Sequence, residues 1–266
     1  MPQSVFDPFD TDRFGNLEAN VRFIDSERLL RDHVRVLEIG SGRGTLLAEL
    51  RRRGVHAIGI EPNPTLAIDA VRRQPPLPVA RMSGDRLGFG DGTFDLVLSF
   101  DVFEHIADSD AHLSEVRRVL RPGGVYALQT PNKWTNSVFE TIRWRSFTAW
   151  KQDHSALHSM EELGARLRAH GFEPSFADVP VVNQFFREKL QRYLGPAGPA
   201  LLRVVNPDRW PMKFRTNFYV VARRLVRDTR PRHDARMSAA NGAHRAYRES
   251  GAEPRTKVRT CIRRTD

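Results

Sequence analysis

Short apolar runs alternate with amphipathic stretches through residues 34–130, and this alternation is the strongest structural signal in the sequence. The apolar runs, each bounded by turn-forming or charged residues, predict buried strands at 34–40, 56–61, 79–85, 94–100 and, after a turn, within 122–130. The stretches between them repeat apolar side chains at helical spacing, which predicts helices at 44–54, 65–74 and 109–121. Near-continuous apolar strands that alternate with helices predict a parallel sheet covered by helices on both faces.

The pattern changes on either side of this region. Apolar residues at near-helical spacing predict a helix over 17–33, which we assign to an N-terminal helical cap, residues 1–33. Residues 131–159 interrupt the alternation with several aromatic side chains, a composition that suits a lid over a flat or apolar substrate as well as a packed cap. The elements predicted beyond it are a helix at 159–171, a strand at 172–179, short helices within 184–213 and a last strand at 216–224.

The net charge of +10 is concentrated near the C-terminal end of the sequence. From Arg223 to Asp266 there are 13 Lys and Arg against 5 Asp and Glu, which gives +8 and leaves +2 for residues 1–222. The last 40 residues, 227–266, have few apolar side chains and no periodicity, which predicts a disordered basic tail after a domain at 34–226. Such a tail could touch anionic lipid or nucleic acid, but a solvated extension is the simpler interpretation, and we expect no specific nucleic-acid partner.

Several other classes of protein are disfavoured. The acidic start of the sequence does not have the order of a secretory signal, and no apolar run approaches the ~18 residues of a membrane span. The single cysteine, Cys261, excludes a disulfide framework and a cysteine metal site, and we expect no bound metal. A cytoplasmic location is therefore expected.

The stretch VLEIGSGRG places three glycines where the first predicted strand meets the first predicted helix. Gly40, Gly42 and Gly44 would let bare backbone approach a ligand in front of a helix amino terminus. Nicotinamide, flavin and sulfonium cofactors all use such loops, and a purely structural turn is also possible. Glu61 ends the second strand, where its carboxylate could accept hydrogen bonds from both hydroxyls of a ribose, or could instead cap a helix.

Five stretches in the order VLEIGSGRG, GIEPN, SGDRLGFGDGTFDLVLSFDVFEHIAD, EVRRVLRPGGVYALQTPN and HSALHSMEELGARLRAHGFE carry a more specific signal. Together they resemble the class I S-adenosylmethionine-dependent methyltransferases, in particular the small-molecule branch that includes the ubiquinone-biosynthesis O-methyltransferases. The resemblance covers roughly residues 34–175. It implies a Rossmann-like methyltransferase fold, with a doubly wound, mostly parallel seven-stranded sheet, and S-adenosylmethionine as cofactor.

The resemblance also assigns parts of the cofactor site. It implies that Glu38 and the glycine loop hold the methionine part, since a carboxylate suits the ammonium and the nearby sulfonium. The loop residues are Gly40, Ser41, Gly42 and Gly44. Glu61 matches the ribose acid, and Pro62 lies where the family packs a side chain on the adenine face.

The adenine side of the implied site follows the third strand. Asp85 closes that predicted strand, where the family's acid accepts a hydrogen bond from the adenine amino group, and Arg86 would offer its backbone N–H. The residues after the fourth strand are expected to line the path to the methyl group; they are Phe100, Asp101 and Val102. One departure concerns the adenine pocket, since Gly88 and Gly90 stand where an apolar-Pro-apolar stretch is usual.

Methyl transfer from a sulfonium mainly needs alignment of the acceptor, and a general base helps when the acceptor is a hydroxyl. His105, in FEHI, and His154, in the aromatic segment, are the candidate bases, because histidine titrates near neutral pH. Each has a structural alternative: His105 would position the loop, and His154 would pack a lid. We favour His154 for the proton and His105 for the framework, with Asp101 or Glu104 as substitutes; only proximity supports His158.

The main functional hypothesis is an O-methyltransferase acting on a small molecule, aromatic or lipid-like. Alternatives are N- or C-methylation, a glycan or glycolipid acceptor, and a non-catalytic protein that retains the fold and binds the cofactor. A nicotinamide-dependent oxidoreductase is disfavoured, because GSGRG shortens the dinucleotide spacing and no Tyr-x-x-x-Lys appears. The helical insertion at 184–213 mixes apolar and basic positions, which suits a pocket wall or a peripheral membrane contact.

Overall fold

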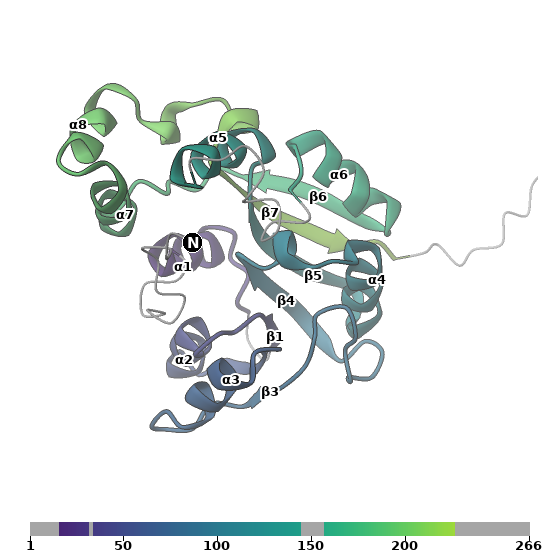
Figure 1. The fold of residues 1–266 in the computed structure, drawn as a ribbon. Helices are drawn as coiled ribbons and strands as arrows, with labels where there is room; N and C mark the ends of the chain where they lie inside the picture. The colour runs from purple at the N-terminus through teal and green to yellow at the C-terminus, as the bar shows by residue number, and fades with distance from the viewer. Residues whose placement is uncertain (1–15, 32–33, 145–156, 227–266) are drawn as a thin grey trace, which may run out of the picture. The chain divides into compact units, whose positions relative to one another are not determined.

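The computed structural model describes residues 16–31, 34–144 and 157–226, and the strands within these ranges form a single seven-stranded sheet (Figure 1). The strands are β1 (Arg35–Ile39), β2 (His56–Ile60), β3 (Val79–Ala80), β4 (Phe94–Phe100), β5 (Leu120–Pro131), β6 (Phe172–Ala177) and β7 (Asn217–Arg224). Their order across the sheet is β3-β2-β1-β4-β5-β7-β6. Strands β1 to β5 pair in parallel, and β7 runs antiparallel to both β5 and β6. The predicted mostly parallel sheet is confirmed.

Helices cover the sheet on both faces, because buried side chains alternate along each central strand. Leu96 and Leu98 of β4 pack in a cluster with α1 (Leu17–Ser26) and α2 (Thr45–Arg52). Val97 packs on the opposite face in a cluster with α4 (Ser109–Val119) and α6 (Met160–Ala169). The chain is therefore doubly wound, and its strand order reverses between β1 and β4, where ligands of such sheets bind.

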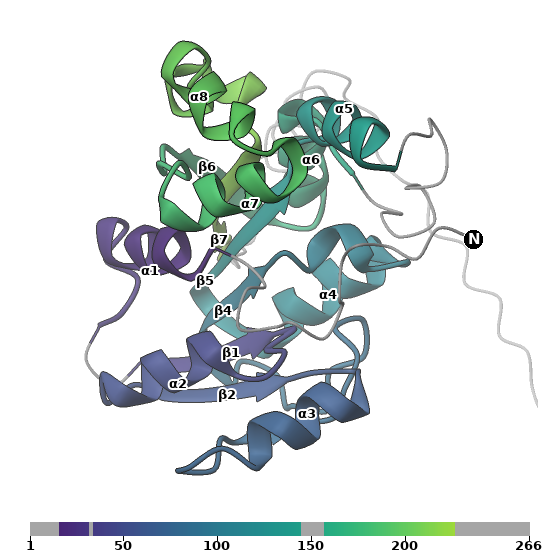
Figure 2. The ribbon, with the colours of Figure 1, turned by 60° about the vertical axis from the view of Figure 1, so that its left-hand side comes forward.

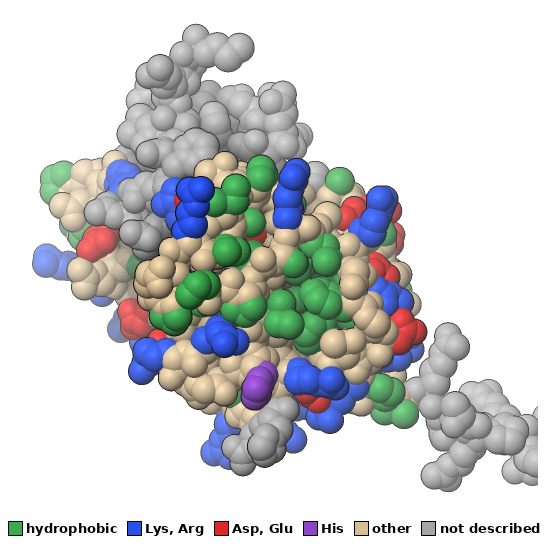
Figure 3. Space-filling view, turned by 90° about the horizontal axis from the view of Figure 1, so that it is seen from below, with side chains coloured by type: hydrophobic (Ala, Val, Ile, Leu, Met, Phe, Trp, Pro, Cys, Tyr) green, Lys and Arg blue, Asp and Glu red, His purple; other side chains and the backbone are tan. Residues whose placement is uncertain are grey.

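The edge of the sheet at β3 is shorter than predicted. The sequence favoured a strand over 79–85, but only Val79 and Ala80 pair with β2. The chain then leaves the sheet and turns at Gly84 and Asp85. Near this edge, β2 and α3 (Pro64–Val71) expose apolar side chains, those of Ile58, Ile68 and Val71. Viewed from below, the molecule shows hydrophobic side chains gathered among basic ones (Figure 3).

Helix α1 is also shorter than the predicted helix at 17–33. It ends at Ser26, and Arg28 adopts a left-handed conformation with φ +50° that redirects the chain. The Leu29 N–H then donates to the Ile24 carbonyl at 3.0 Å, so that Leu29 is buried from a turn instead of a helix. Asn16 begins the helix by accepting from the Ala19 N–H, and its Nδ2 donates to the Val181 carbonyl at 3.0 Å.

The aromatic segment at 131–159 contains a helix that the sequence did not predict, α5 (Lys133–Trp144). Its Trp134 and Val138 are exposed. Residues 145–156 lie outside the described residues, and with them His154. The lid therefore stays a prediction.

Helices α7 (Gln184–Leu194) and α8 (Ala197–Val204) form the predicted helical insertion and pack on each other (Figure 2). A Cβ on Gly198 would lie 2.6 Å from the Leu190 carbonyl oxygen, so the close approach of the two helices requires glycine there. None of the helices in the described ranges is long and apolar enough to span a bilayer. The basic tail at 227–266 lies outside those ranges, and its disorder stays a prediction.

Candidate functional site

The glycine loop occupies the point where the strand order reverses. Gly40, Gly42 and Gly44 all have positive φ, at +72°, +53° and +76°. A Cβ on Gly40 would lie 2.3 Å from Val102 Cγ2, and a Cβ on Gly44 would lie 2.4 Å from Leu77 Cδ1. No atom lies within 4 Å of the place where a Cβ on Gly42 would stand. The outer glycines are thus needed for packing, whereas the middle one borders open space.

Glu61 ties the second strand to this loop. It follows β2 directly and is buried, with Oε2 accepting from the Gly42 N–H at 3.0 Å and Oε1 accepting from the Asn63 N–H at 2.9 Å. Each carboxylate oxygen can accept more than one hydrogen bond, so both retain capacity for ligand hydroxyls. The alternative role of Glu61, as a helix cap, is not observed: Asn63 caps α3, and its side chain accepts from the Thr65 and Leu66 N–H groups.

Glu38 is the most unusual acid of the site. It lies on β1 with 6% of its surface exposed, and no described group donates a hydrogen bond to its buried Oε2. Burial, with a smaller contribution from the charge of Glu61, raises the pKa of Glu38 to about 8, although the Leu47 N–H opposes this. A buried oxygen without a donor is costly unless a ligand supplies one. A cationic group beside Glu38 would satisfy that oxygen and favour the ionised carboxylate.

This environment fits the methionine part of S-adenosylmethionine. Its ammonium group carries the donors and the charge that Glu38 Oε2 needs, and the open space at Gly42 would admit the chain to which that ammonium belongs. The backbone N–H groups of Gly40 and Ser41 already donate to the Ile60 carbonyl, at 2.9 and 3.0 Å, and so hold the loop in place.

The turn that carries Asp85 differs from the prediction. Asp85 lies in a turn five residues beyond Ala80, the last residue of β3, and so does not close that strand. Its Oδ1 accepts from the Ser83 hydroxyl, and the backbone N–H of Arg86 donates to the Ser83 carbonyl at 3.2 Å. Pro62 and Arg86 are exposed, and Asp85 is half-buried.

The end of β4 has a strained backbone. Asp101 has φ +53°, a conformation that residues other than glycine rarely adopt. Its N–H is shared between the carbonyl of Gln129, at 3.2 Å, and the side-chain Oε1 of Gln129, at 2.8 Å. The Nε2 of Gln129 is buried and has no acceptor among the described residues. Strain and an unpaired donor at the carboxyl end of a strand are both typical of a functional site.

The FEHI turn places its acid inside and its histidine outside. Glu104 is 2% exposed and accepts from the Thr130 hydroxyl at 3.1 Å, whereas His105 is exposed. Burial, and then the nearby charge of Asp101, raise the pKa of Glu104 to about 8. At the end of β4, the Phe100 ring packs edge-on against the Phe23 ring of α1, with the ring centroids 6.1 Å apart.

A polar cavity of about 500 Å³ opens beside His158. It is lined by Ala107, Asp108, Ser109, Asp110, Leu157, His158 and Arg166. His158 is largely buried, its ring lies 5.6 Å from that of Phe103, and its carbonyl accepts from the Lys133 N–H at 3.0 Å. Within the described residues, no group of three or more His, Cys, Asp or Glu is arranged to hold a metal ion.

The structure therefore brings about half of the predicted residues together and adds some that sequence reasoning missed. Glu38, the glycine loop, Glu61 and Val102 meet at the carboxyl ends of β1, β2 and β4. The residues that the sequence did not single out are Gln129, Thr130, Asn132 and His112. Gln129 and Thr130 lie at the end of β5 and Asn132 directly follows that strand, and this position was the signal that could have found them.

Comparisons with known proteins show the family of the chain. A family model described as a methyltransferase domain matches residues 9–175. The chain is 33% identical over 141 residues to a probable S-adenosylmethionine-dependent methyltransferase of Mycolicibacterium smegmatis, covering 52% of this chain and 51% of that relative. It is 28% identical over 151 residues to a ubiquinone biosynthesis O-methyltransferase of Rhizobium etli, covering 53% and 60%. The chain thus spans between half and two thirds of the length of these two relatives.

The solved structures show a likeness of fold. A SAM-dependent methyltransferase from Archaeoglobus fulgidus superposes with a TM-score of 0.55 at 17% identity, covering 81% of this chain and 97% of that structure. At this identity the likeness supports the Rossmann-like methyltransferase architecture and nothing about the substrate.

Proposed function

Because the chain belongs to the methyltransferase-domain family, with S-adenosylmethionine as its cofactor, we propose that it transfers a methyl group to a hydroxyl of a small molecule. The observation that carries the cofactor part of this proposal is the buried, unsatisfied Oε2 of Glu38, together with the open space at Gly42. The hydroxyl acceptor is supported by the similarity to a ubiquinone biosynthesis O-methyltransferase. When bound, S-adenosylmethionine supplies a methyl group on a sulfonium, which is a good leaving group.

In this proposal each part of the cofactor has its own residues. Glu38 binds the ammonium group, and the glycine loop admits the methionine chain. Glu61 accepts from the ribose hydroxyls while its hydrogen bonds to Gly42 and Asn63 fix its orientation. Pro62 packs on the adenine, and Asp85 accepts from its amino group, with Arg86 beside it. The path to the methyl group is lined by Phe100, Asp101 and Val102.

The protein contributes mainly alignment to the transfer, since the leaving group needs little help. Val102 occupies the space that a Cβ on Gly40 would need, and we expect this packing of the end of β4 on the glycine loop to set the distance between the acceptor path and the cofactor. A hydroxyl acceptor must also lose its proton, and we assign this role to His154, with His105 holding the framework. The buried Glu104, which precedes His105, and the strained Asp101, four residues before it, are the alternative proton acceptors.

The polar cavity beside His158 is the proposed entry for the acceptor. Its lining includes Asp108, Asp110 and Arg166, which can donate and accept hydrogen bonds to a polar molecule. This lining favours an acceptor with several hydroxyl groups, such as a glycan, over a purely apolar one. Glycan methylation is therefore the second candidate function.

An acceptor screen tests the proposal. Phenols, quinols, glycans, amines and lipid-linked alcohols would each be incubated with S-adenosylmethionine, and released S-adenosylhomocysteine would be measured. We expect turnover with a hydroxyl acceptor and none in a Gly42→Val variant, whose side chain fills the cofactor space. Turnover confined to amines or carbon acids would contradict the O-methylation proposal. Binding of S-adenosylmethionine without turnover of any class would favour the non-catalytic alternative.

We also propose a peripheral membrane contact near the start of α5. Asn132 Nδ2 donates to the Lys213 carbonyl at 2.9 Å, so the start of α5 lies beside Lys213 and Phe214. Trp134 is 61% exposed and Phe214 is 47% exposed. Lys213 Nζ lies 5.0 Å from the Phe214 ring centroid. Exposed aromatic rings beside lysines suit a membrane surface with anionic lipids.

Vesicle sedimentation tests this contact. The full chain should sediment with phosphatidylglycerol vesicles, and Trp134→Ser combined with Phe214→Ser should release it. Ile68→Ser, an exposed apolar residue on α3, is the matched control and should leave binding unchanged. Equal sedimentation of the double variant and the native chain would contradict the contact.

A further inference from the structure

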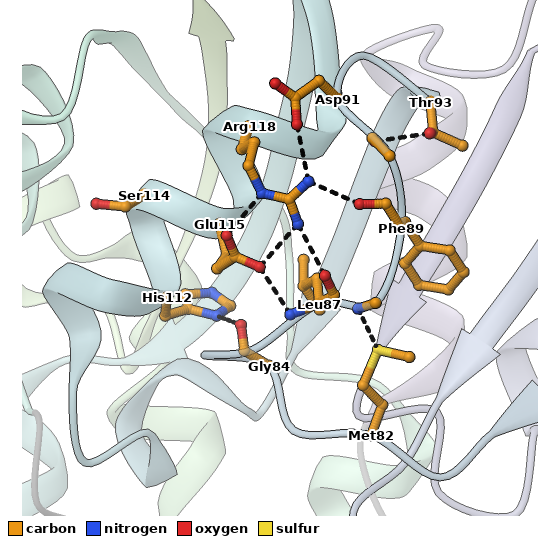
Figure 4. Close-up of polar contacts among 12 residues, drawn as sticks. Met82, Gly84, Leu87, Phe89, Asp91, Thr93, His112, Ser114, Glu115 and Arg118 are labelled. Atoms are coloured by element: carbon orange, nitrogen blue, oxygen red, sulfur yellow. Dashed lines mark hydrogen bonds and ion pairs between the residues drawn. The ribbon is translucent and has the colours of Figure 1, made fainter.

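The loop between β3 and β4 is held from outside by helix α4 (Figure 4). Within the loop, few hydrogen bonds join its own groups, such as the Gly88 N–H to Met82 Sδ at 3.1 Å and the Thr93 hydroxyl to the Gly90 carbonyl at 2.7 Å. Three side chains of α4 make the remaining contacts that Figure 4 draws, and we call them the α4 clamp; they are His112, Glu115 and Arg118.

Arg118 makes the largest number of these contacts. Its Nη2 donates to the Leu87 carbonyl at 2.8 Å, and its Nη1 donates to the Phe89 carbonyl at 2.6 Å and to Asp91 Oδ1 at 2.9 Å. A planar guanidinium with several donors can bridge acceptors in this way, which an ammonium group cannot. Arg118 thus holds the loop at three alternate residues, Leu87, Phe89 and Asp91.

Glu115 binds the backbone N–H of Leu87, the residue whose carbonyl Arg118 binds. Its Oε2 accepts from the Leu87 N–H at 2.8 Å, while its Oε1 accepts from Arg118 Nε at 2.7 Å. Both backbone groups of Leu87 are therefore bound by side chains of α4, and the Leu87 side chain is buried. Leu87 is therefore held by hydrogen bonds to its backbone and by the packing of its side chain.

His112 anchors the loop next to Asp85. Its Nδ1 lies 2.7 Å from the Gly84 carbonyl, and its Nε2 lies 2.9 Å from the Tyr126 hydroxyl. A carbonyl only accepts, so Nδ1 carries the proton and the neutral Nε2 accepts from Tyr126. Burial lowers the pKa of His112 to about 4, which keeps the ring neutral at physiological pH. The Tyr126 oxygen in turn lies 3.1 Å from the Ser99 hydroxyl, so the anchor reaches two strands.

The sequence explains why such an anchor is needed. Gly88 and Gly90 stand within the loop, and glycine leaves the backbone many conformations to choose from. The clamp contacts lie on both sides of Asp85: Gly84 precedes it, and Leu87 follows two residues later. An acceptor that recognises one amino group must be held within a few tenths of an ångström.

We propose that the α4 clamp determines base specificity by holding Asp85 where its carboxylate accepts a hydrogen bond from the amino group of adenine. With a base that lacks this amino group, the Asp85 carboxylate is left without a donor. This inference rests on the proposed role of Asp85 in the cofactor site. Arg118, Glu115 and His112 act as positioning residues, because they touch the loop and not the ligand.

The experiment compares two ligands that differ at one group of the base, S-adenosylhomocysteine and S-inosylhomocysteine. Calorimetry would give both dissociation constants for the full chain, for Arg118→Met and for the control Arg117→Met. Arg117 is on the same helix but borders Gly171 instead of the loop. Arg118→Lys is the milder second variant, which keeps the positive charge and loses the fork of donors.

The native chain and Arg117→Met should prefer the adenine ligand by about 10- to 100-fold, the effect of one unsatisfied buried polar group. In Arg118→Met the preference should fall to within about threefold of unity, and Arg118→Lys should lie between, while affinity for the inosine ligand changes little.

Three results would overturn the inference, and they differ in what else they overturn. An unchanged preference in both Arg118 variants, with the two affinities lowered alike, would reduce the clamp to a structural role and leave Asp85 in place. A native chain that binds both ligands equally would remove the base-reading role of Asp85 itself, and the clamp with it. A failure of the native chain to bind either ligand would overturn the proposed cofactor site as a whole.

Discussion

Binding of the cofactor should release a proton from Glu38. Burial and the charge of Glu61 raise the pKa of this carboxyl to about 8 in the ligand-free chain, so about 0.9 of the molecules hold the proton at pH 7. A bound ammonium group favours the ionised carboxylate, so the pKa should fall well below 7 in the complex. Binding of S-adenosylhomocysteine at pH 7 should therefore release about 0.9 protons, and at pH 8 about half a proton.

Calorimetry in buffers of different ionisation enthalpy measures this release directly. The observed binding enthalpy should vary linearly with the ionisation enthalpy of the buffer, with a slope equal to the number of protons released. Glu38→Gln should bind more weakly and show a slope near zero, whereas Glu104→Gln, which removes the other acid whose pKa is raised to about 8, should keep the slope. A native slope of zero at pH 7, or an unchanged slope in Glu38→Gln, would refute the reasoning.

The same shift has a consequence for stability without ligand. Because the pKa of Glu38 lies above its unfolded value of 4.5, the folded chain binds more protons than the unfolded chain between pH 4.5 and about 8. The free energy of unfolding should therefore fall as the pH rises through this window, by at most about 5 kcal/mol for this group. Urea denaturation should show Glu38→Gln gaining stability relative to the native chain as the pH rises from 5 to 8.

Three further predictions follow from the glycine loop, the histidines and the tail. Gly40→Ala should lower the thermal midpoint more than Gly42→Ala, because both residues have a positive φ but only the Cβ at Gly40 would also lie 2.3 Å from Val102. Gly42→Ala should cost about 1–2 kcal/mol of folding free energy and chiefly weaken cofactor binding, and equal midpoints of the two variants would argue against the packing role of Gly40. With the best acceptor from the screen, His154→Gln should lower turnover by roughly 10²–10⁴-fold while cofactor affinity holds, and His105→Gln should act on binding; near-native turnover in both variants across pH would shift the proton to Asp101 or Glu104. Deletion of residues 227–266 should leave the thermal midpoint and the affinity for S-adenosylhomocysteine unchanged, because this segment has too little apolar surface to join a core; a marked loss of either would show that it packs on the domain.

Local patterns in the sequence were enough to predict the sheet and the place of the site. The strand at 94–100 is buried on both faces, so its apolar run predicted β4 with its observed bounds. The spacing of Gly40, Gly42 and Gly44 predicted a tight turn, because positive φ at three positions requires residues without a Cβ. Both features depend on neighbours in the chain, and a sequence displays those directly.

Local patterns failed where a partner distant in the sequence decides the structure. The strand predicted at 79–85 ends early because β2 offers pairing only to Val79 and Ala80, and the Gly84 and Asp85 that follow are residue types disfavoured in strands. Trp134 and Val138 are four residues apart, which is helical spacing, but the aromatic composition of 131–159 led us to predict a lid there instead of helix α5.

The chemistry of the site belongs mostly to tertiary structure. That Glu38 is an acid is visible in the sequence, but its raised pKa comes from burial and from Glu61, which follows another strand. His112 looked like one polar position on an amphipathic helix, yet it is fully buried and lies 2.7 Å from the carbonyl of Gly84, 28 residues earlier. Desolvation and long-range hydrogen bonds depend on which segments fold against each other, and no local pattern in the chain encodes that choice.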